Sequence, residues 1–195
     1  DGYAGVSLLQ MGFGVATLAL TWTIARRIAG EAVAVPATWW LALSPIHVID
    51  SSVLLTEVPF SAFLLAAIVP LTPLVERRVP GPARWAASGL TLGAATLIRP
   101  IALYMPIAVL AAMGFSGLRR RLVIPGLVFL AAFSLPVGAW LVRNHQMTGV
   151  AIVSTIQGIN LAFYRAAGAI AVEDGISVEV LDLRSLLPMD DEAIV

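Results

Sequence analysis

The sequence predicts an all-α protein, a polytopic transmembrane helical bundle of about six spanning helices with extracytoplasmic loops. Two observations predict this fold class. Of the 195 residues, 59% are hydrophobic and only 12% are charged, whereas about a quarter of the residues of a soluble protein are charged. The apolar residues also gather in long runs, and the mean hydropathy is +0.91. In lipid, a helix satisfies its backbone amides within its own segment, so each run is expected to be helical.

Six apolar runs are the candidate helices. They lie near residues 6–25, 32–49, 58–75, 85–98, 101–116 and 122–142. A helix needs roughly 20 apolar residues to cross a hydrocarbon core of about 30 Å, so the first and last runs are long enough. The four middle runs are shorter and are expected to have little tilt or to lie among neighbouring helices.

Two features predict how the fourth run is built. Gly89 and Gly93 form a small-xxx-small pair, which favours close packing against another helix. Pro100 follows the run and is expected to separate it from the fifth, because proline lacks the N–H that a continuous helix requires.

The distribution of charge predicts the orientation in the cell membrane. All twelve basic residues are arginine, and eight of them flank one set of loops: Arg26, Arg27, Arg77, Arg78, Arg84, Arg119, Arg120 and Arg121. By the positive-inside rule these loops are cytoplasmic. Residue 1, the 50–57 loop, the 99–100 turn and the chain after Leu141 are then extracytoplasmic. The expected organisation is a transmembrane region over residues 1–143 and an extracytoplasmic polar segment over residues 144–195.

Several function classes are not indicated. The sequence contains neither a Walker A run nor a Rossmann glycine fingerprint, and no Ser-His-Asp or zincin pattern is present. The arginines are too few and too dispersed for nucleic-acid binding. Residue 1 is Asp rather than Met, and we expect the chain to be an internal fragment of a longer polytopic protein.

The first candidate site contains Asp50 and Glu57, two carboxylates at the predicted extracytoplasmic surface. A carboxylate there can act as a catalytic base, orient an acceptor or bind a metal. A structural explanation is also open for Glu57, because an acid in the first turn of a helix is stabilised by the helix dipole, with Thr56 or Ser52 as N-cap. Asp50 can equally be an ordinary interfacial acid. His47 lies three residues before Asp50, but two possible ligands are weak evidence for a metal.

Arg99 is the second candidate, because it lies between two apolar runs. An arginine costs roughly 2.5–3.5 kcal/mol at the centre of a bilayer. It is more stable at the interface, where its guanidinium can bind a phosphate with two hydrogen bonds. Binding of an ordinary lipid headgroup is an equally open explanation.

The third candidate begins at the end of the last run, where Arg143 and Asn144 follow Trp140. Tryptophan is common at membrane interfaces, and the arginine there can bind phosphates. Asn144 and Asn160 carry amides suited to sugar hydroxyls, and Gly158 allows a ligand to approach the backbone closely. A polar loop at the exit of a helix explains the same residues without a ligand.

At these positions the chain resembles the GT-C glycosyltransferases, specifically family 39, which includes protein O-mannosyltransferases and the bacterial aminoarabinose transferase. The similar segments are residues 25–30 (ARRIAG), 41–45 (LALSP), 54–57 (LLTE), 89–100 (GLTLGAATLIRP), 140–144 (WLVRN), 154–155 (ST) and 158–161 (GINL). Their order and spacing cover roughly residues 6–162. After Leu161 the chain departs from the resemblance, because Ala162 follows where related proteins often have a Gly-Asn-Asn run.

The resemblance implies an enzyme that transfers a sugar from a polyprenyl-phosphate carrier to a protein, lipid or glycan acceptor on the extracytoplasmic face. Glu57 matches the second acid of the family, and Arg99 and Arg143 match positions near the donor phosphate. The main catalytic acid of such enzymes lies in a loop that ends where this chain begins, so the fragment alone is expected to be inactive. No cofactor is implied, and a requirement for a divalent metal stays open.

Two other classes are compatible with a polytopic bundle. A transporter or flippase for lipid-linked intermediates is expected to show discontinuous helices in two repeated halves, and no repeat is evident in the sequence. A non-catalytic membrane scaffold is the other alternative.

Overall fold

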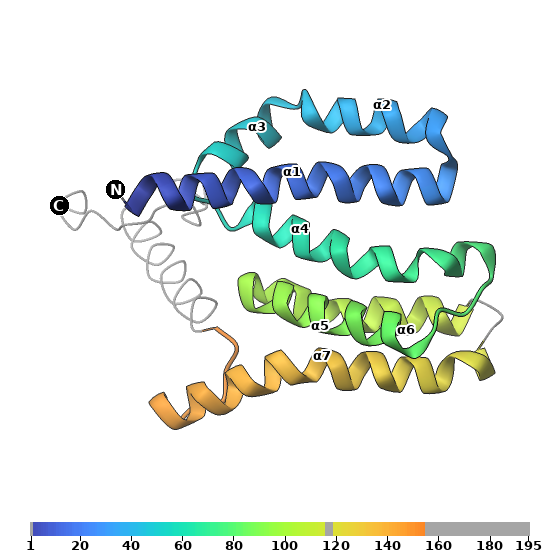
Figure 1. Ribbon diagram of the computed structural model, residues 1–195. Coiled ribbons are helices and arrows are strands. Elements are labelled where there is room, and N and C mark those ends of the chain that lie inside the picture. Colours follow the sequence, from blue (N-terminus) through green and yellow to red (C-terminus); the bar gives the residue numbers. More distant parts are fainter. Residues whose placement is uncertain (1, 116–118, 155–195) are drawn as a thin grey trace, which may run out of the picture. The chain divides into compact units, whose positions relative to one another are not determined.

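The computed structural model describes residues 2–115 and 119–154 of the chain. Nearly all of these residues belong to one compact unit, Asp1–Val153. Within the described ranges every regular element is a helix, either α or 3₁₀, so the predicted all-α class is confirmed. Figure 1 shows the long helices side by side, in the order α2, α1, α4, α5 and α7.

The first two helices form an antiparallel pair. Helix α1 (Gly2–Ala29) is followed by α2 (Glu31–Ala42) after the single residue Gly30. Gly30 has φ +83°, a left-handed conformation that glycine adopts without a steric penalty. The reversal therefore needs only one residue.

A break divides the second apolar run, which was expected to form one helix. Helix α2 ends at Ala42, and the short α3 covers Pro45–Ser52 at an angle of 59° to it. Ser44 is extended, with ψ 121°, because a residue that precedes proline is disfavoured in the helical conformation. The bend directs the chain across the N-terminal half of α1 toward the next helix (Figure 1).

The third run forms α4 (Glu57–Ile68), which continues as the 3₁₀ segment η1 (Val69–Glu76). Pro70 and Pro73 lie in η1, where the missing proline N–H groups are compatible with the change from the α to the 3₁₀ form. The chain leaves this segment at Arg77, which has a left-handed φ of 56°.

The remaining helices are α5 (Pro82–Ile98), η2 (Pro100–Tyr104), α6 (Met105–Phe115) and α7 (Arg119–Thr148). Arg99 is extended, with φ −137° and ψ 114°, and Pro100 begins the 3₁₀ turn. The expected separation of the fourth and fifth runs at Pro100 is therefore confirmed.

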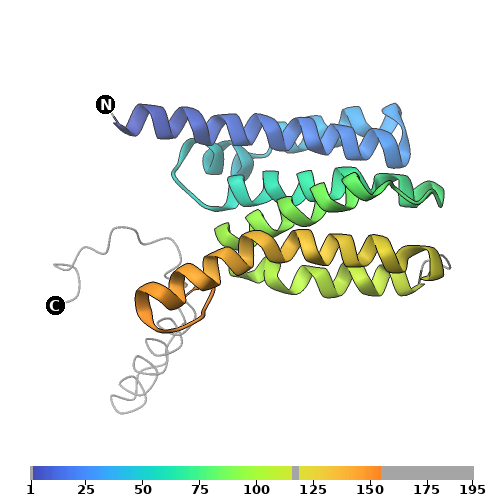
Figure 2. The same cartoon turned by 60° about the horizontal axis from the view of Figure 1, so that its bottom comes forward.

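The core lies where α5 packs against α7, and both views show these two helices adjacent (Figures 1 and 2). A Cβ atom added at Gly89 would collide with the Phe129 carbonyl oxygen, and one at Gly93 would collide with the Pro136 ring. The small-xxx-small pair therefore brings the backbones close together, as predicted. Trp85 and Phe129 are fully buried beside it, with their rings edge to face at 6.3 Å.

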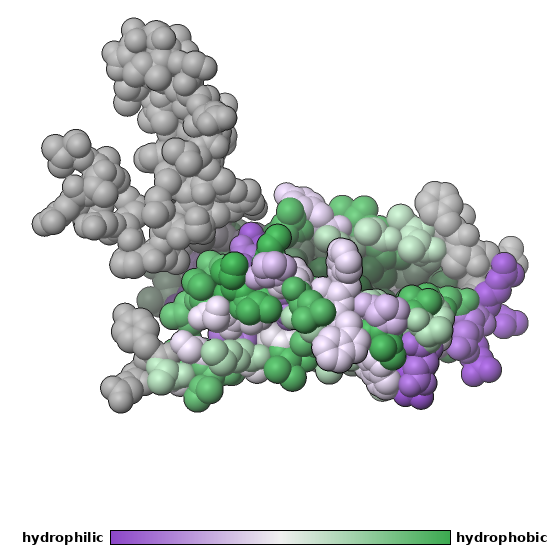
Figure 3. Space-filling model, turned by 90° about the horizontal axis from the view of Figure 1, so that it is seen from above, coloured by the Kyte–Doolittle hydropathy of each residue, from purple (hydrophilic) through white to green (hydrophobic). Residues whose placement is uncertain are grey.

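Much of the surface of the bundle is apolar. Figure 3 shows hydrophobic residues over a large part of one face. Large apolar side chains on several helices are mostly exposed, including Leu8, Trp40, Ile107 and Ile124. Soluble monomers rarely expose such an area, whereas the hydrocarbon core of a bilayer is a favourable environment for it. The chain is a membrane protein.

Fewer than six stretches of the described residues meet the length and hydropathy of a membrane span. Three stretches are long and apolar enough to cross a membrane, namely Ala4–Ala29, Glu57–Glu76 and Arg121–Thr148, and the bent pair of α2 and α3 is a fourth if it is counted as one span. Helix α5 has 17 residues, or roughly 25 Å, less than the thickness of the hydrocarbon core. All six apolar runs are helical, but the described residues do not confirm six spans.

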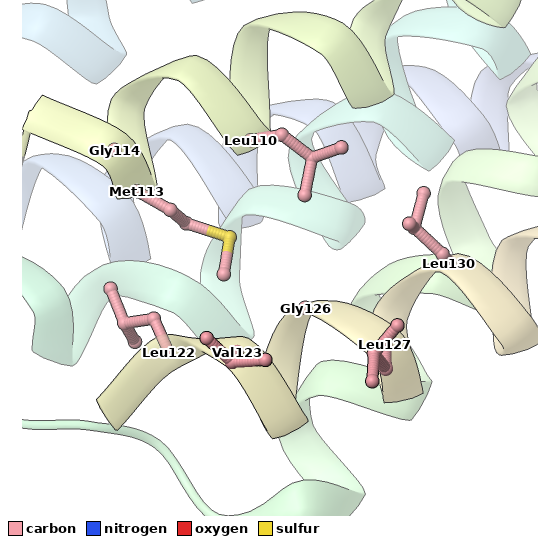
Figure 4. A pocket seen from close by; sticks show the side chains of 8 residues that line it. All are labelled: Leu110, Met113, Gly114, Leu122, Val123, Gly126, Leu127 and Leu130. Carbon is pink, nitrogen blue, oxygen red and sulfur yellow. The ribbon is translucent and has the colours of Figure 1, made fainter. Parts of the chain in front are cut away.

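An apolar groove of about 320 Å³ lies between the end of α6 and the start of α7. Figure 4 shows the Met113 side chain extending from α6 toward α7, above Gly126. Leucines from both helices line the rest of the groove, together with Val123. None of the described residues that line the groove is charged, and the groove lies at the end of α7 opposite to Asn144.

Candidate active site

An ion pair joins the first residue of α4 to the residue that follows α5. The Nη1 atom of Arg99 lies 3.0 Å from the Oε1 atom of Glu57. The two side chains are partly exposed, by 26% for Arg99 and 39% for Glu57. Helices α4 and α5 run antiparallel, so the start of one lies beside the end of the other (Figure 1).

The local structure explains the position of each partner. Glu57 lies in the first turn of α4, as predicted, but the N-cap residue Thr56 forms no side-chain capping bond. The Ser52 hydroxyl donates instead to carbonyl oxygens of its own helix, those of Val48 and Ile49. The expected hydroxyl cap is therefore wrong, and among the described residues the Glu57 carboxylate is paired with Arg99.

Arg99 also contacts an aromatic ring. Its guanidinium carbon lies 5.8 Å from the centre of the Phe60 ring, on the first turn of α4. A cation over an aromatic face is attracted by the ring quadrupole. Phe60 and Glu57 therefore both hold the arginine against α4, while about a quarter of its side chain stays exposed.

Gln10 supports the loop before Glu57 and was not among the residues predicted from the sequence. The Gln10 side chain is only 6% exposed. Its amide nitrogen donates to the carbonyl oxygens of Asp50, at 3.2 Å, and Leu55, at 2.8 Å. These two bonds hold both ends of the 50–55 segment against α1. The available signal was an amide side chain inside an otherwise apolar run, because polar groups inside spans usually have a role.

Asp50 lies on α3 and is half-buried. Within the described ranges its carboxylate has no hydrogen bond or ion pair, while its backbone carbonyl accepts the Gln10 bond. Nor do the described residues contain a group of three His, Asp or Glu side chains arranged to hold a metal.

Arg143 and Asn144 form a second cluster at the end of α7. The Arg143 guanidinium lies 4.6 Å from the Trp140 ring centre and donates to Asn144 Oδ1 at 3.1 Å. Asn144 Nδ2 donates to the Ile152 carbonyl oxygen at 2.7 Å, and the Trp140 indole donates to that of Val153 at 3.0 Å. The cluster therefore fastens the 150–153 segment to α7. Both polar atoms of the Asn144 amide have protein partners, while Arg143 stays exposed.

The structure thus brings the candidate residues together in two pairs. Glu57 is bonded to Arg99, and Arg143 to Asn144. The start of α4 and the ends of α5 and α7 lie at the same end of the bundle (Figures 1 and 2), but no bond joins the two pairs in the described part of the chain. Gly158 and Asn160 lie outside the described residues.

Together the fold and this site define an all-helical membrane protein with a carboxylate–guanidinium pair at one end of its bundle. The family model described as "Dolichyl-phosphate-mannose-protein mannosyltransferase" matches residues 1–156, and the chain therefore belongs to that family. It is a membrane glycosyltransferase of the GT-C type. The comparisons with curated proteins and with solved structures give no match.

Proposed function

We propose that this protein transfers a sugar from a polyprenyl-phosphate-linked donor to a protein, lipid or glycan acceptor on the extracytoplasmic face of the cell membrane. The observation that supports this proposal most strongly is the Glu57–Arg99 ion pair. It combines a carboxylate and a guanidinium at the end of an apolar bundle, in a chain that belongs to a mannosyltransferase family.

The chemistry of the reaction requires both kinds of group. The bond between the anomeric carbon and the phosphate oxygen breaks, and its electron pair leaves with the phosphate. A bond from the anomeric carbon to an acceptor oxygen forms, and the acceptor loses its proton to a base. Positive charge at the departing phosphate and a carboxylate at the acceptor therefore both lower the barrier.

We assign the phosphate to Arg99 and Arg143. A guanidinium has five N–H donors, and Arg99 uses one nitrogen for Glu57 while part of its side chain stays exposed. Arg143 is exposed beside an interfacial Trp140. In this arrangement the prenyl tail lies in the lipid beside the bundle, and the headgroup meets the guanidinium groups.

Glu57 and Asp50 are the carboxylates that we assign to catalysis. Because Glu57 is bonded to Arg99, it orients the arginine as well as providing negative charge near the acceptor. Asp50 has no bonded partner in the described part of the chain, so its oxygens are available to accept a proton. Asn144, Gly158 and Asn160 are the proposed contacts to the sugar. The domain boundary at residues 143–144 also stays a proposal.

The test uses membranes that contain the product of the complete gene and a labelled polyprenyl-phosphate sugar. Release of polyprenyl phosphate measures transfer, whatever the acceptor is. We expect Glu57→Gln and Arg99→Ala each to lower the release roughly 10²–10³-fold, the usual effect of removing one charge-stabilising group. The matched control is Glu31→Gln, which changes an exposed acid at the other end of the bundle. Unchanged release in both site variants would contradict the assigned roles.

The same assay separates the alternatives. Movement of the donor between leaflets without release of polyprenyl phosphate would indicate a transporter. Absence of both activities in the complete protein would indicate a scaffold. The described part of the chain contains one bent helix pair, α2 and α3, but no second pair that repeats it, so the two repeated halves expected of a transporter are not seen there.

A further inference from the structure

The end of the bundle opposite to Glu57 contains a polar cavity that the proposed reaction does not use. The cavity has a volume of about 460 Å³ and lies between the end of α1, η1 and the start of α5. Its charged lining consists of Arg27, Arg78, Arg84 and Glu76. Three guanidinium groups face one carboxylate, which leaves an excess of two positive charges.

The arginines in this cavity differ in what holds them. Arg27 donates from Nη1 to the Val69 carbonyl oxygen and to the Thr72 hydroxyl, both at 3.2 Å. Thr72 is buried and its own hydroxyl donates to Val69 at 2.8 Å, so one edge of the guanidinium is fixed at the wall. The rest of the Arg27 side chain is exposed and free to bind a ligand.

Arg78 and Arg84 leave positive charge uncompensated. Arg78 forms an ion pair with Glu76 at 3.4 Å, but its side chain is 79% exposed. Arg84 is exposed, and among the described residues its guanidinium has no hydrogen bond or ion pair. The turn that ends at Arg78 is defined by backbone bonds from Arg77 to Leu74 and from Arg78 to Pro73, and the Arg84 N–H donates to the Gly81 carbonyl oxygen at the start of α5. Each of these two cations therefore lies on backbone that is fixed by hydrogen bonds.

The surroundings indicate which anion this cavity accepts. Two stretches that are long and apolar enough to span a membrane, Ala4–Ala29 and Glu57–Glu76, both end here. Ile28 and Val75 lie on these ends and are about half exposed, so apolar side chains adjoin the charged cavity. Figure 3 shows hydrophilic residues gathered at the end where α1 meets α2, next to the apolar face. An amphiphile with a phosphate headgroup fits this arrangement, because its phosphate can enter the charged cavity while its tail lies against the adjoining apolar side chains.

We infer that this cavity is a binding site for the phosphate of an anionic phospholipid, whose acyl chains lie along the exposed apolar residues of α1 and η1. Arginine binds phosphate through charge-assisted hydrogen bonds, and basic pockets between membrane helices bind anionic headgroups. The excess positive charge favours a headgroup with net negative charge over a zwitterionic one. The inference is independent of the sugar-transfer proposal, because it uses other residues at the other end of the bundle.

The test is a lipid titration of the detergent-purified full-length protein, followed by native mass spectrometry. The probes are dioleoylphosphatidylglycerol and dioleoylphosphatidylcholine. We expect the wild-type protein to retain the anionic lipid preferentially, and Arg84→Gln or Arg78→Gln to weaken its binding roughly tenfold. Because Arg78 is 79% exposed, its substitution does not threaten the fold.

The control is Arg121→Gln, which removes an exposed arginine near the start of α7, outside the cavity. Retention of the anionic lipid by this variant supports a defined site. Equal weakening by Arg121→Gln, or equal retention of both lipids by every variant, would overturn it. Displacement of the lipid by millimolar glycerol 3-phosphate would overturn the lipid assignment in favour of a soluble phosphate compound.

Discussion

Arg99 Nη1 lies 3.0 Å from Glu57 Oε1, and this bond connects the end of α5 to the beginning of α4. Each charge lies at the helix terminus whose dipole stabilises it, since carboxylates are favoured at N-termini and cations at C-termini. Because the two apolar helices pack antiparallel, the start of α4 and the end of α5 lie side by side, and the two charges meet there. The pair also offsets part of the cost of placing Arg99 between two apolar helices.

The first prediction concerns this pair as a unit. If Glu57 orients Arg99, the double variant Glu57→Gln/Arg99→Ala should release polyprenyl phosphate no more slowly than the poorer single variant. Residues that act together show such non-additivity. To check for non-additivity, we compare the release rates of the wild type, both single variants and the double variant. As a control, the fold losses in release rate caused by Glu31→Gln and Arg99→Ala should multiply in the double variant, because the two residues do not touch. If the losses from Glu57→Gln and Arg99→Ala also multiplied, the two residues would act independently.

The second prediction concerns Gln10, which holds the segment before Glu57. Gln10→Leu removes two hydrogen bonds, each worth about 1 kcal/mol, and leaves the Asp50 and Leu55 carbonyl groups without this donor. We expect transfer to fall roughly tenfold, since displacing a catalytic group by a small distance has a large effect on rate. We also expect amide hydrogen exchange over residues 51–56 to accelerate.

The control for Gln10 is Thr23→Val in the same helix. Among the described residues the exposed Thr23 hydroxyl bonds only within α1, to the Ala19 carbonyl oxygen at 2.7 Å. This variant should leave exchange in the 51–56 segment unchanged. Faster exchange there in both variants would mean that α1 is destabilised as a whole, rather than that Gln10 fastens the loop.

The third prediction concerns the interface of α5 and α7. Gly89→Ala places a methyl group against the Phe129 carbonyl oxygen and the Phe133 backbone nitrogen, and backbone atoms move less readily than side-chain ends. We expect a loss of about 1–3 kcal/mol in the free energy of unfolding, which is typical of overpacking. Denaturant titration followed by circular dichroism measures it. Gly12→Ala in α1 is the control, because no atom lies within 4 Å of the added methyl group.

Several features of the fold could be predicted from the sequence. The apolar runs gave the approximate positions of the long helices in the described ranges, and Pro100 and the pair Gly89 and Gly93 had the predicted effects. These features depend on local backbone chemistry or on a regular spacing. The break at Ser44 was missed because the apolar character continues through it, although the Ser-Pro sequence was a visible signal.

The site was only partly predictable for a physical reason. Glu57 and Arg99 were identified separately, from their positions in loops, but their bond depends on how α4 and α5 pack. Gln10 was missed because its partners are backbone atoms of another segment, at a sequence separation of 40 and 45 residues. The contact of Asn144 to sugar hydroxyls stays a prediction, and the bonds of its amide to Arg143 and Ile152 were not foreseen because Ile152 lies eight residues away.

The fourth prediction follows from that cluster. Trp140→Phe removes the indole donor to Val153, and Asn144→Ala removes the bond to Ile152. We expect elastase to cleave residues 150–153 several-fold faster in either variant, because local opening should become more frequent. The control is His145→Ala, an exposed side chain on the same turn. Cleavage at the wild-type rate in both variants would show that these bonds do not hold the segment.

The fifth prediction concerns orientation, on which the proposed reaction depends. The 195 residues contain no cysteine, so a single introduced thiol can be labelled without background from this region. Thr56 and Arg78 are both exposed and lie at opposite ends of the Glu57–Glu76 stretch. In intact cells a membrane-impermeant maleimide should label Thr56→Cys, while Arg78→Cys should react only after permeabilisation, because arginine-rich loops stay in the cytoplasm. Labelling after denaturation controls for the amount of each variant. The reverse pattern would place Glu57 and Arg99 on the cytoplasmic side, out of reach of an extracytoplasmic acceptor, and the proposed function would then have to be abandoned.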